Sequence, residues 1–214
     1  MVSRLSPNVN EQVEKGISVL KKGGVVVYPT DTVYGLGAGM VFWKAVERIY
    51  AIKERPRTMP LPLLLADISQ VDAVAESISP LSRFLMRKFW PGGLTLVLCA
   101  SSEVPDIVAA GGKTVAVRIP DHAVPIALIR GLGMPIVGTS ANLSGQPSPL
   151  TADAVYSQLG DRVDLIIDGG RCLGGVESTI VDATGETSVI LREGAISRAE
   201  IERICREYLR KDLS

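Results

Sequence analysis

The sequence predicts an α/β protein in which a mixed β-sheet is flanked by helices. Short β-branched runs alternate with amphipathic segments along the 214 residues, a pattern typical of α/β proteins. Several predicted strands follow one another with no helix between them, which favours a mixed sheet over a purely parallel one. No internal repeat or change in composition marks a second unit, so residues 1–214 are expected to form one domain.

Helices are expected where apolar residues recur every three or four positions. Asn10 is a candidate N-cap for the first helix and Thr151 for a later one, while Pro56 prevents the second helix from continuing. Ser197 and Glu200 form a capping box that opens the last helix. The expected helices cover residues 10–22, 42–52, 80–89, 124–131 and 152–159, with the last one beginning after residue 197.

Strands are expected in the short apolar runs between these helices. Residues 30–39 are expected instead to form a loop, because their glycines permit close backbone approach and positive φ. Residues 145–149 are rich in proline and serine and are expected to form a connection. The expected strands cover residues 25–28, 61–66, 94–98, 114–119, 136–137, 163–167, 179–181 and 189–191.

Composition narrows the classes of function. The chain has 23 basic and 23 acidic side chains, which argues against a protein that coats nucleic acid non-specifically but allows a local basic patch. The three cysteines are too few and too widely spaced for a disulfide framework or a zinc pattern, which fits a reducing compartment. No signal peptide is evident, and no apolar run approaches the roughly 20 residues of a membrane span. A cytoplasmic protein without membrane association is expected.

Two polar clusters stand next to β-branched runs and are the main functional signal. Residues 29–37 read Pro-Thr-Asp-Thr-Val-Tyr-Gly-Leu-Gly, and residues 138–145 read Gly-Thr-Ser-Ala-Asn-Leu-Ser-Gly. Polar groups that follow buried strands commonly form ligand sites in α/β sheets. Lys53 and Arg55 can neutralise a phosphate, since lysine offers a compact charge and arginine a planar fork. The pattern favours a nucleotide-dependent enzyme.

A structural interpretation of the same residues remains open. Cations at the end of a helix interact favourably with its dipole, which accounts for Lys53 and Arg55 without a ligand. The hydroxyls and amides of both clusters can instead cap their own turns. Thr114 and Arg118 lie four positions apart on one predicted strand and can share a face, where Arg118 needs a carboxylate from the protein or from a ligand.

Several classes of enzyme are disfavoured. The chain contains no GxxxxGK[ST] sequence, which excludes a P-loop, and no GxGxxG follows the first predicted strand, which argues against a Rossmann dinucleotide site. His122 is the only histidine, so a Ser–His hydrolase would depend on it alone.

Seven segments of the chain, in the same order, resemble the YrdC-like family of threonylcarbamoyl-adenylate synthases, and together they cover nearly the whole chain. They are residues 28–37, 52–56, 91–96, 114–122, 138–145, 177–182 and 190–194. The resemblance implies a twisted mixed sheet flanked by helices around a large concave, electropositive cavity. It also implies that L-threonine, bicarbonate and ATP, with Mg²⁺, are converted to threonylcarbamoyl-AMP and pyrophosphate.

The resemblance assigns roles to particular residues. Its KxR and SxN signature falls on Lys53, Arg55, Ser140 and Asn142, which are the implied catalytic residues. The implied threonine site consists of Thr32, Arg118, Ser178 and the Gly138 backbone. The implied ATP site consists of Arg55, Thr114, Ser140, Ser148 and Arg192, with the backbone near Met59. No metal ligand from the protein is implied.

The resemblance also implies partners. The product would pass to a downstream transferase complex that modifies the adenosine next to the anticodon in tRNAs reading codons that begin with A. A weak affinity for RNA itself would accompany this role.

Two departures from the pattern of the family stand out. Some relatives carry a histidine near Leu64, where this chain has three leucines. Longer relatives add a C-terminal domain, whereas this chain ends at Ser214, so the single-domain form is expected.

Two other functions are weighed against the synthase. Related domains form carbamoyl-adenylate from carbamoyl phosphate, but they usually occur in longer chains with zinc-finger-like cysteines. A non-catalytic RNA-binding module is the other alternative, and zero net charge counts against it.

Overall fold

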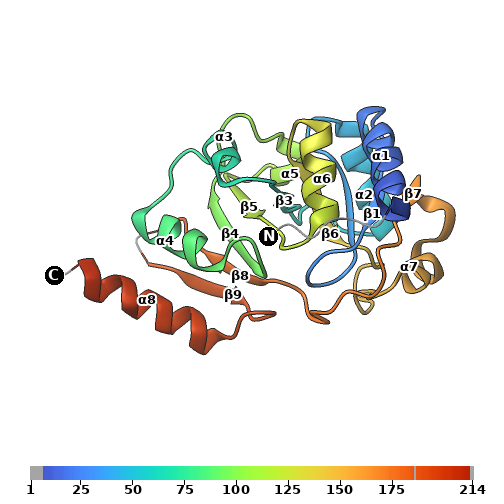
Figure 1. Cartoon of the computed structure of the whole chain (residues 1–214). Helices are drawn as coiled ribbons and strands as arrows, with labels where there is room; N and C mark the ends of the chain where they lie inside the picture. The colour runs from blue at the N-terminus through green and yellow to red at the C-terminus, as the bar shows by residue number, and fades with distance from the viewer. Residues whose placement is uncertain (1–6, 186, 213–214) are drawn as a thin grey trace.

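A computed structural model describes residues 7–185 and 187–212, and in it the described strands join one mixed sheet (Figure 1). The strand order is β7-β1-β2-β6-β3-β5-β4-β8-β9. The pairs β1–β7, β3–β5 and β4–β8 are parallel, and the other neighbours are antiparallel. The predicted mixed sheet flanked by helices is therefore confirmed. The strands are β1 (Val26–Tyr28), β2 (Gly35–Gly39), β3 (Leu63–Leu64), β4 (Leu94–Cys99), β5 (Thr114–Arg118), β6 (Ile136–Ser140), β7 (Leu165–Ile166), β8 (Thr179–Asp182) and β9 (Val189–Arg192).

Helices pack on the sheet in groups (Figure 1). Helices α1 and α6 lie side by side, α2 packs against β2, and α4 packs against α8 next to β8 and β9. None of the helices in the described part of the chain is long and apolar enough to cross a membrane. The helices are α1 (Pro7–Lys21), α2 (Trp43–Lys53), α3 (Val71–Val74), α4 (Pro80–Phe89), α5 (Asp106–Ala109), α6 (Ala123–Leu132), α7 (Ala152–Leu159) and α8 (Arg198–Asp212), with 3₁₀ turns η1 (Ile68–Gln70) and η2 (Gly160–Arg162).

Strand β2 corrects the prediction of a loop over residues 30–39. Gly35–Gly39 pairs with β1 on one side and β6 on the other, and all five residues are buried. A Cβ on Gly37 would lie 2.3 Å from the Val137 carbonyl oxygen, and one on Gly35 would lie 2.6 Å from the Tyr28 ring. The predicted close backbone approach is thus present, but none of the three glycines of β2 has positive φ. The strand reads Gly-Leu-Gly-Ala-Gly and so lacks the β-branched residues that identify strands in a sequence.

Helix ends agree with the sequence where a side chain caps them. The Thr151 hydroxyl accepts the N–H of Ala154 at 3.3 Å, and the Ser197 hydroxyl accepts that of Glu200 at 3.3 Å. The first helix is different, because it already includes Pro7 and Asn10 lies inside it. Asn10 is therefore not the N-cap. The short helices α3 and α5 were not predicted, since four residues are too few to show helical periodicity.

Candidate functional site

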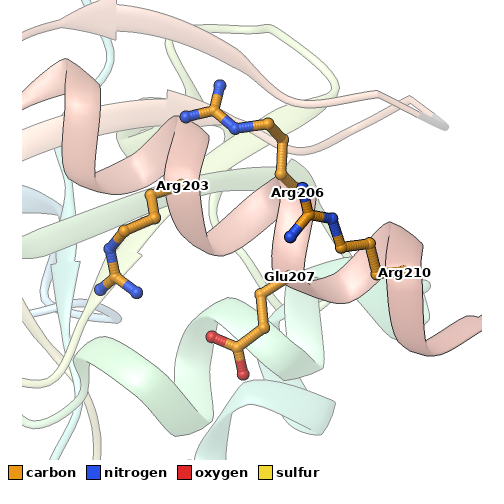
Figure 2. Close-up of a pocket in the computed structure, with 4 residues that line it drawn as sticks. All are labelled: Arg203, Arg206, Glu207 and Arg210. Atoms are coloured by element: carbon orange, nitrogen blue, oxygen red, sulfur yellow. The ribbon is translucent and has the colours of Figure 1, made fainter.

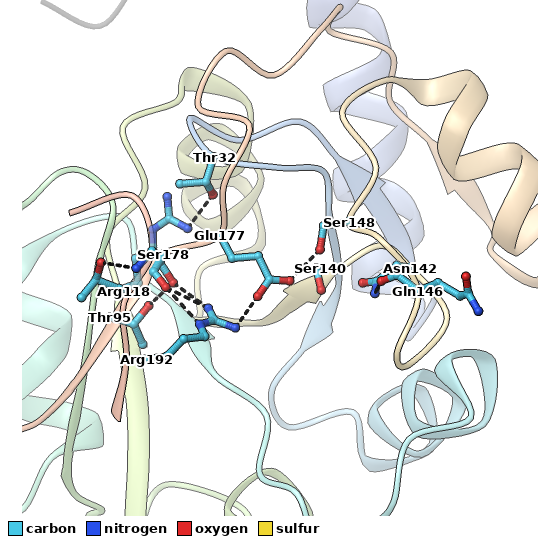
Figure 3. A network of polar contacts seen from close by, with 12 residues as sticks. Thr32, Thr95, Arg118, Ser140, Asn142, Gln146, Ser148, Glu177, Ser178 and Arg192 are labelled. Carbon is cyan, nitrogen blue, oxygen red and sulfur yellow. Dashed lines mark hydrogen bonds and ion pairs between the residues drawn. The ribbon is translucent and has the colours of Figure 1, made fainter. Parts of the chain in front are cut away.

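The turn after β1 builds the first part of the site. The Thr30 hydroxyl accepts the N–H of Thr32 at 3.1 Å and of Val33 at 3.2 Å, and donates to the Val33 carbonyl at 2.6 Å. Thr30 therefore has the structural role that was left open for these hydroxyls. The turn leaves the Thr32 hydroxyl directed at a neighbouring arginine (Figure 3).

Arg118 lies at the end of β5 and is 6% exposed. Its Nε donates to the Gly92 carbonyl at 2.8 Å, its Nη1 to the Thr32 hydroxyl at 3.0 Å, and its Nη2 to Asp31 Oδ1 at 2.6 Å. Burial lowers the pKa of Arg118 and the Asp31 carboxylate opposes this, and the guanidinium stays protonated. The acceptor that the sequence required is thus a carboxylate of the protein, and Arg118 and Thr32 meet as expected.

Ser178 and Arg192 adjoin the same region (Figure 3). The Ser178 hydroxyl is hydrogen-bonded to the Thr95 hydroxyl at 2.8 Å. Arg192, at the end of β9, donates from Nη2 to the Ser178 carbonyl at 2.9 Å and from Nε at 3.2 Å. No role was predicted for Thr95, although it lies within the matching segment 91–96. It fixes the orientation of the Ser178 side chain.

Lys53 joins the two polar clusters. It is the last residue of α2 and only 2% exposed, and its Nζ donates to the Ser140 carbonyl at 2.5 Å and the Asn142 carbonyl at 2.7 Å. A third donation reaches Asn142 Oδ1 at 3.2 Å. Burial and the charge of Arg55 lower the pKa of Lys53 to about 8, and Glu177 opposes them. All three ammonium protons are used within the protein, so Lys53 orders the segment that carries Ser140 and Asn142.

Asn142 and Ser140 differ in what they offer. The Asn142 amide donates to the carbonyls of Gln146 at 2.6 Å and Leu143 at 2.9 Å, so this side chain closes its own turn. Ser140 is the last residue of β6, whereas the sequence predicted that it follows the strand. Its half-buried side chain faces Glu177 (Figure 3), and its hydroxyl is among the groups that lower the pKa of that carboxyl.

Glu177 is the most important residue that sequence reasoning missed. Its Oε1 accepts a hydrogen bond from the Ser148 hydroxyl at 2.6 Å, and its Oε2 accepts one from Arg192 Nη1. Burial raises the pKa of Glu177, but the Ser148 hydrogen bond and the charge of Arg192 outweigh it, so the pKa is lowered. The only signal in the sequence was its position between two glycines and Ser178 in a matching segment.

The remaining candidates lie nearby or on the same sheet. Arg55 donates to the carbonyls of Met59 at 3.3 Å and Pro60 at 3.0 Å, and burial lowers its pKa. Thr114 begins β5, and because side chains four positions apart on a strand point to the same side, it shares a face with Arg118, as predicted. No hydrogen bond joins the Thr114 side chain to the described residues, so the structure does not tie it to the polar network.

Gly138 contacts the leucine that replaces the histidine of some relatives. Its N–H donates to the Pro62 carbonyl at 2.8 Å, and a Cβ added to it would lie 2.4 Å from Leu64 Cγ. The Leu64 side chain therefore covers the Gly138 backbone, and the Gly138 N–H is already engaged. The contact of Leu64 with Gly138 is apolar.

His122 has a structural role. Its Nδ1 accepts the N–H of Val124 at 3.2 Å and so caps α6, and burial lowers its pKa. The Nδ1 lone pair is thus engaged at the N-terminus of the helix.

Two further observations concern ligands. No group of three His, Cys, Asp or Glu side chains within residues 7–185 and 187–212 is arranged to hold a metal ion.

A pocket of about 490 Å³ on α8 is lined by Arg203, Arg206, Glu207 and Arg210 (Figure 2). This pocket contains none of the predicted site residues, and its charge is partly neutralised by Glu202 near Arg206 at 3.8 Å and by Glu207.

The fold and the site define an α/β protein with a mixed sheet, in which arginine, hydroxyl and carboxylate side chains from several strands and loops are joined by hydrogen bonds. The chain belongs to the Sua5/YciO/YrdC family: the family model, described as "Telomere recombination", matches residues 18–194. The chain is 42% identical over 205 residues to a threonylcarbamoyl-AMP synthase of Bacillus subtilis, covering 95% of this chain and 59% of that protein.

Solved structures agree with this assignment. The structure of Sua5 of P. abyssi complexed with L-threonine has a TM-score of 0.90 at 39% identity, covering 95% of this chain and 59% of that one. E. coli YciO has a TM-score of 0.82 at 30% identity, covering 94% of this chain and 96% of that one. The chain thus spans about three fifths of the length of the B. subtilis relative and of Sua5.

Proposed function

We propose that this protein is a threonylcarbamoyl-AMP synthase, which converts L-threonine, bicarbonate and ATP to threonylcarbamoyl-AMP and pyrophosphate. The observation that carries the proposal is the contact of Arg118 with Thr32 and Asp31, close to the group formed by Ser178, Arg192 and Glu177. An amino-acid site and a phosphate site that adjoin each other are what this reaction needs. The name of the B. subtilis relative and the threonine complex of Sua5 support it.

The threonine site is proposed at Arg118. A guanidinium has five N–H groups, and three of those of Arg118 are used within the protein, which leaves two for a substrate carboxylate. The Thr32 and Ser178 hydroxyls would contact the rest of the amino acid. Asp31 would provide an acceptor for the substrate amine, since its Oδ1 bonds Arg118 and its Oδ2 has no hydrogen-bond partner among the described residues.

The ATP site is proposed at Arg55, Arg192, Ser140, Ser148 and Thr114, with the Met59 carbonyl beside Arg55. Bicarbonate takes up a proton and loses water to give carbon dioxide; the neutral amine of threonine then attacks this carbon dioxide and releases one proton as the carbamate forms. A carbamate oxygen then attacks the α-phosphorus, and the bond to the pyrophosphate oxygen breaks. Arg55 and Arg192 would neutralise the leaving pyrophosphate, and Mg²⁺ brought by ATP would supply further positive charge there. Lys53 and Asn142 hold the segment that carries Ser140.

Pyrophosphate release from ATP and bicarbonate, with and without L-threonine and with L-serine as a control, tests the proposal. Threonine-dependent release is the expected result. Release only with carbamoyl phosphate would overturn it in favour of a carbamoyl-adenylate enzyme, and no release with any acceptor would overturn it in favour of a binding protein.

The use of the product is part of the proposal. Threonylcarbamoyl-AMP would serve a transferase complex that modifies the adenosine next to the anticodon in tRNAs reading codons that begin with A, in the cytoplasm. Any affinity of this chain for RNA is expected to be weak because its formal net charge is zero. Titration of tRNA against the protein at two salt concentrations measures this affinity, and tight, steeply salt-dependent binding would contradict it.

A further inference from the structure

The Glu177 carboxylate lies among the side chains proposed to bind ATP, and the proposed reaction gives it no function. The two oxygens of Glu177 accept hydrogen bonds from Ser148 and Arg192. Glu177 also raises the pKa of both Lys53 and Arg55, so its negative charge acts on every cation of this part of the site. A single carboxylate therefore lies where the proposed phosphate ligands converge.

The same donors are needed by two anions. Ser148 and Arg192 cannot donate the same N–H and O–H groups to Glu177 and to a phosphate, and two anions within hydrogen-bonding distance of these donors repel each other. Without any anion, the positive charges would repel one another instead, and Arg192 already contributes to lowering the pKa of Arg55. The cations of this site therefore need an anionic partner both with and without bound ATP.

We propose that Glu177 is the internal counter-ion of this site: its carboxylate binds Arg192 and Ser148 while the site is empty and gives them up to the triphosphate when ATP binds. The proposal rests on the proposed function, because it takes these groups to be phosphate ligands. Glu177 is in this sense a positioning residue, which keeps the phosphate-binding side chains oriented in the absence of substrate.

The local structure allows such an exchange by rotation of one side chain. The backbone of Glu177 is fixed, because its carbonyl accepts the N–H of Ala195 at 2.8 Å and a Cβ on Gly194 would lie 2.2 Å from that carbonyl oxygen. The Glu177 side chain, by contrast, is 32% exposed and can turn toward solvent. The Glu177 carboxylate can therefore leave Arg192 by rotation of its side chain, while its backbone stays in place.

Binding of inorganic tripolyphosphate, measured by calorimetry in the presence of EDTA, tests the proposal without any contribution of turnover or of a bridging metal. Glu177→Gln keeps the shape of the side chain and removes its charge. It is expected to bind tripolyphosphate about fivefold more tightly than the wild type, since a partly exposed ion pair no longer competes. Without ligand, its thermal midpoint is expected to fall by about 2–4 °C, and tripolyphosphate should restore it.

Glu11→Gln is the matched control. Glu11 pairs with Lys15 on α1, so this variant changes the net charge equally but touches no proposed ligand. Its affinity for tripolyphosphate is expected to equal that of the wild type. If Glu177→Gln does not fold, Glu177→Asp keeps the charge on a shorter side chain, and it too should bind tripolyphosphate more tightly than the wild type.

The outcomes separate this proposal from the proposed function. Unchanged or weaker binding by Glu177→Gln, with clear binding by the wild type, overturns the counter-ion proposal alone. Weaker binding of ATP by this variant only in the presence of Mg²⁺ also overturns it, because Glu177 would then be a metal ligand. A wild type that binds neither tripolyphosphate nor ATP overturns both proposals.

Discussion

Lys53 shows at the scale of one residue how burial changes the chemistry of a charged group. Its ammonium is enclosed by the carbonyls of Ser140 and Asn142 and by the Asn142 side chain, which together satisfy its three protons. The sequence suggested a direct phosphate ligand, whereas the geometry makes it the group that orders the segment after β6. A buried cation without these acceptors would be strongly destabilising.

This environment makes substrate binding sensitive to alkaline pH. Burial lowers the pKa of Lys53 from its ordinary value of 10.5 to about 8, so the side chain loses its charge as the pH rises through 8. Loss of the proton removes one hydrogen bond to the segment that carries Ser140, and the affinity for ATP is expected to fall between pH 7.5 and 9.5. Calorimetric titration at four pH values in this range measures the effect, and a constant affinity up to pH 9.5 would contradict it.

Arg118 is the second residue that permits a sharp test. Arg118→Lys keeps the charge but loses the planar fork that bonds Thr32 and Asp31 and that is proposed to bind a substrate carboxylate at the same time. The KM for L-threonine is expected to rise roughly 10- to 100-fold, as for the loss of a hydrogen bond to a charged group, with little change in the affinity for ATP.

Initial rates of pyrophosphate release at varied threonine measure this change. Arg130→Lys, at an exposed position of α6, serves as the control and should behave like the wild type. An equal loss of threonine and ATP affinity in Arg118→Lys would argue against a threonine-specific role.

Among the secondary structure elements, β2 is the one most constrained by packing. It lies between β1 and β6 with every residue buried, and its glycines allow the Tyr28 ring and the β6 backbone to approach closely. The strand positions both polar clusters, because its first residue pairs with Ser140 and the Thr30–Val33 turn precedes it.

A methyl group in the middle of β2 should therefore be costly. Gly37→Ala places its Cβ 2.3 Å from the Val137 carbonyl oxygen, so the strands must separate, and the free energy of unfolding is expected to fall by about 2–3 kcal/mol. Urea denaturation measures it. Gly185→Ala is the control, because its Cβ would lie 3.8 Å from the nearest atom, and a similar loss in both variants would contradict the explanation.

The start of α6 gives a second test at this scale. His122→Ala removes the acceptor for the Val124 N–H and is expected to cost about 1 kcal/mol of stability while leaving pyrophosphate release intact. His122→Asn restores a good N-cap and should recover the stability. Loss of activity in both variants, with the stability of the asparagine variant restored, would show instead that the ring takes part in catalysis.

For the whole molecule, the main point is that the site draws on strands far apart in the sheet. Ser140 comes from β6 in its interior, Arg118 from β5, and Arg192 from β9 at its edge. The residues of β9 are mostly exposed, whereas all of β1 is buried. Edge strands of this kind open locally at a lower free energy than the core.

ATP bound by Arg192 should therefore restrain the edge of the sheet. Hydrogen exchange of the β9 amides is expected to slow when ATP is added, while exchange in β1 stays unchanged. Mass spectrometry of peptides covering residues 189–192 and 26–28 measures both. Equal slowing in both segments would indicate global stabilisation, and no change in β9 would argue against a contact between ATP and Arg192.

Most of the fold could be predicted from the sequence, because apolar periodicity and helix caps act locally. Helix α4 has the predicted bounds, and the Thr151 and Ser197 caps form as expected. Strand β2 could not be predicted, since its residues have no intrinsic preference for a strand and are held in one by their neighbours on both sides.

For the site, the sequence by itself determined which groups are present: the hydroxyls of Thr32 and Ser178 and the cations Lys53, Arg118 and Arg192 are all in segments that match the family, and Ser148 follows one of them. Only the tertiary structure decided how they are used. Lys53 is engaged by two carbonyls, Arg118 by Asp31, and Arg192 by Glu177. The physical reason is that a charge removed from water must find a partner in space, and these partners come from segments distant in the sequence.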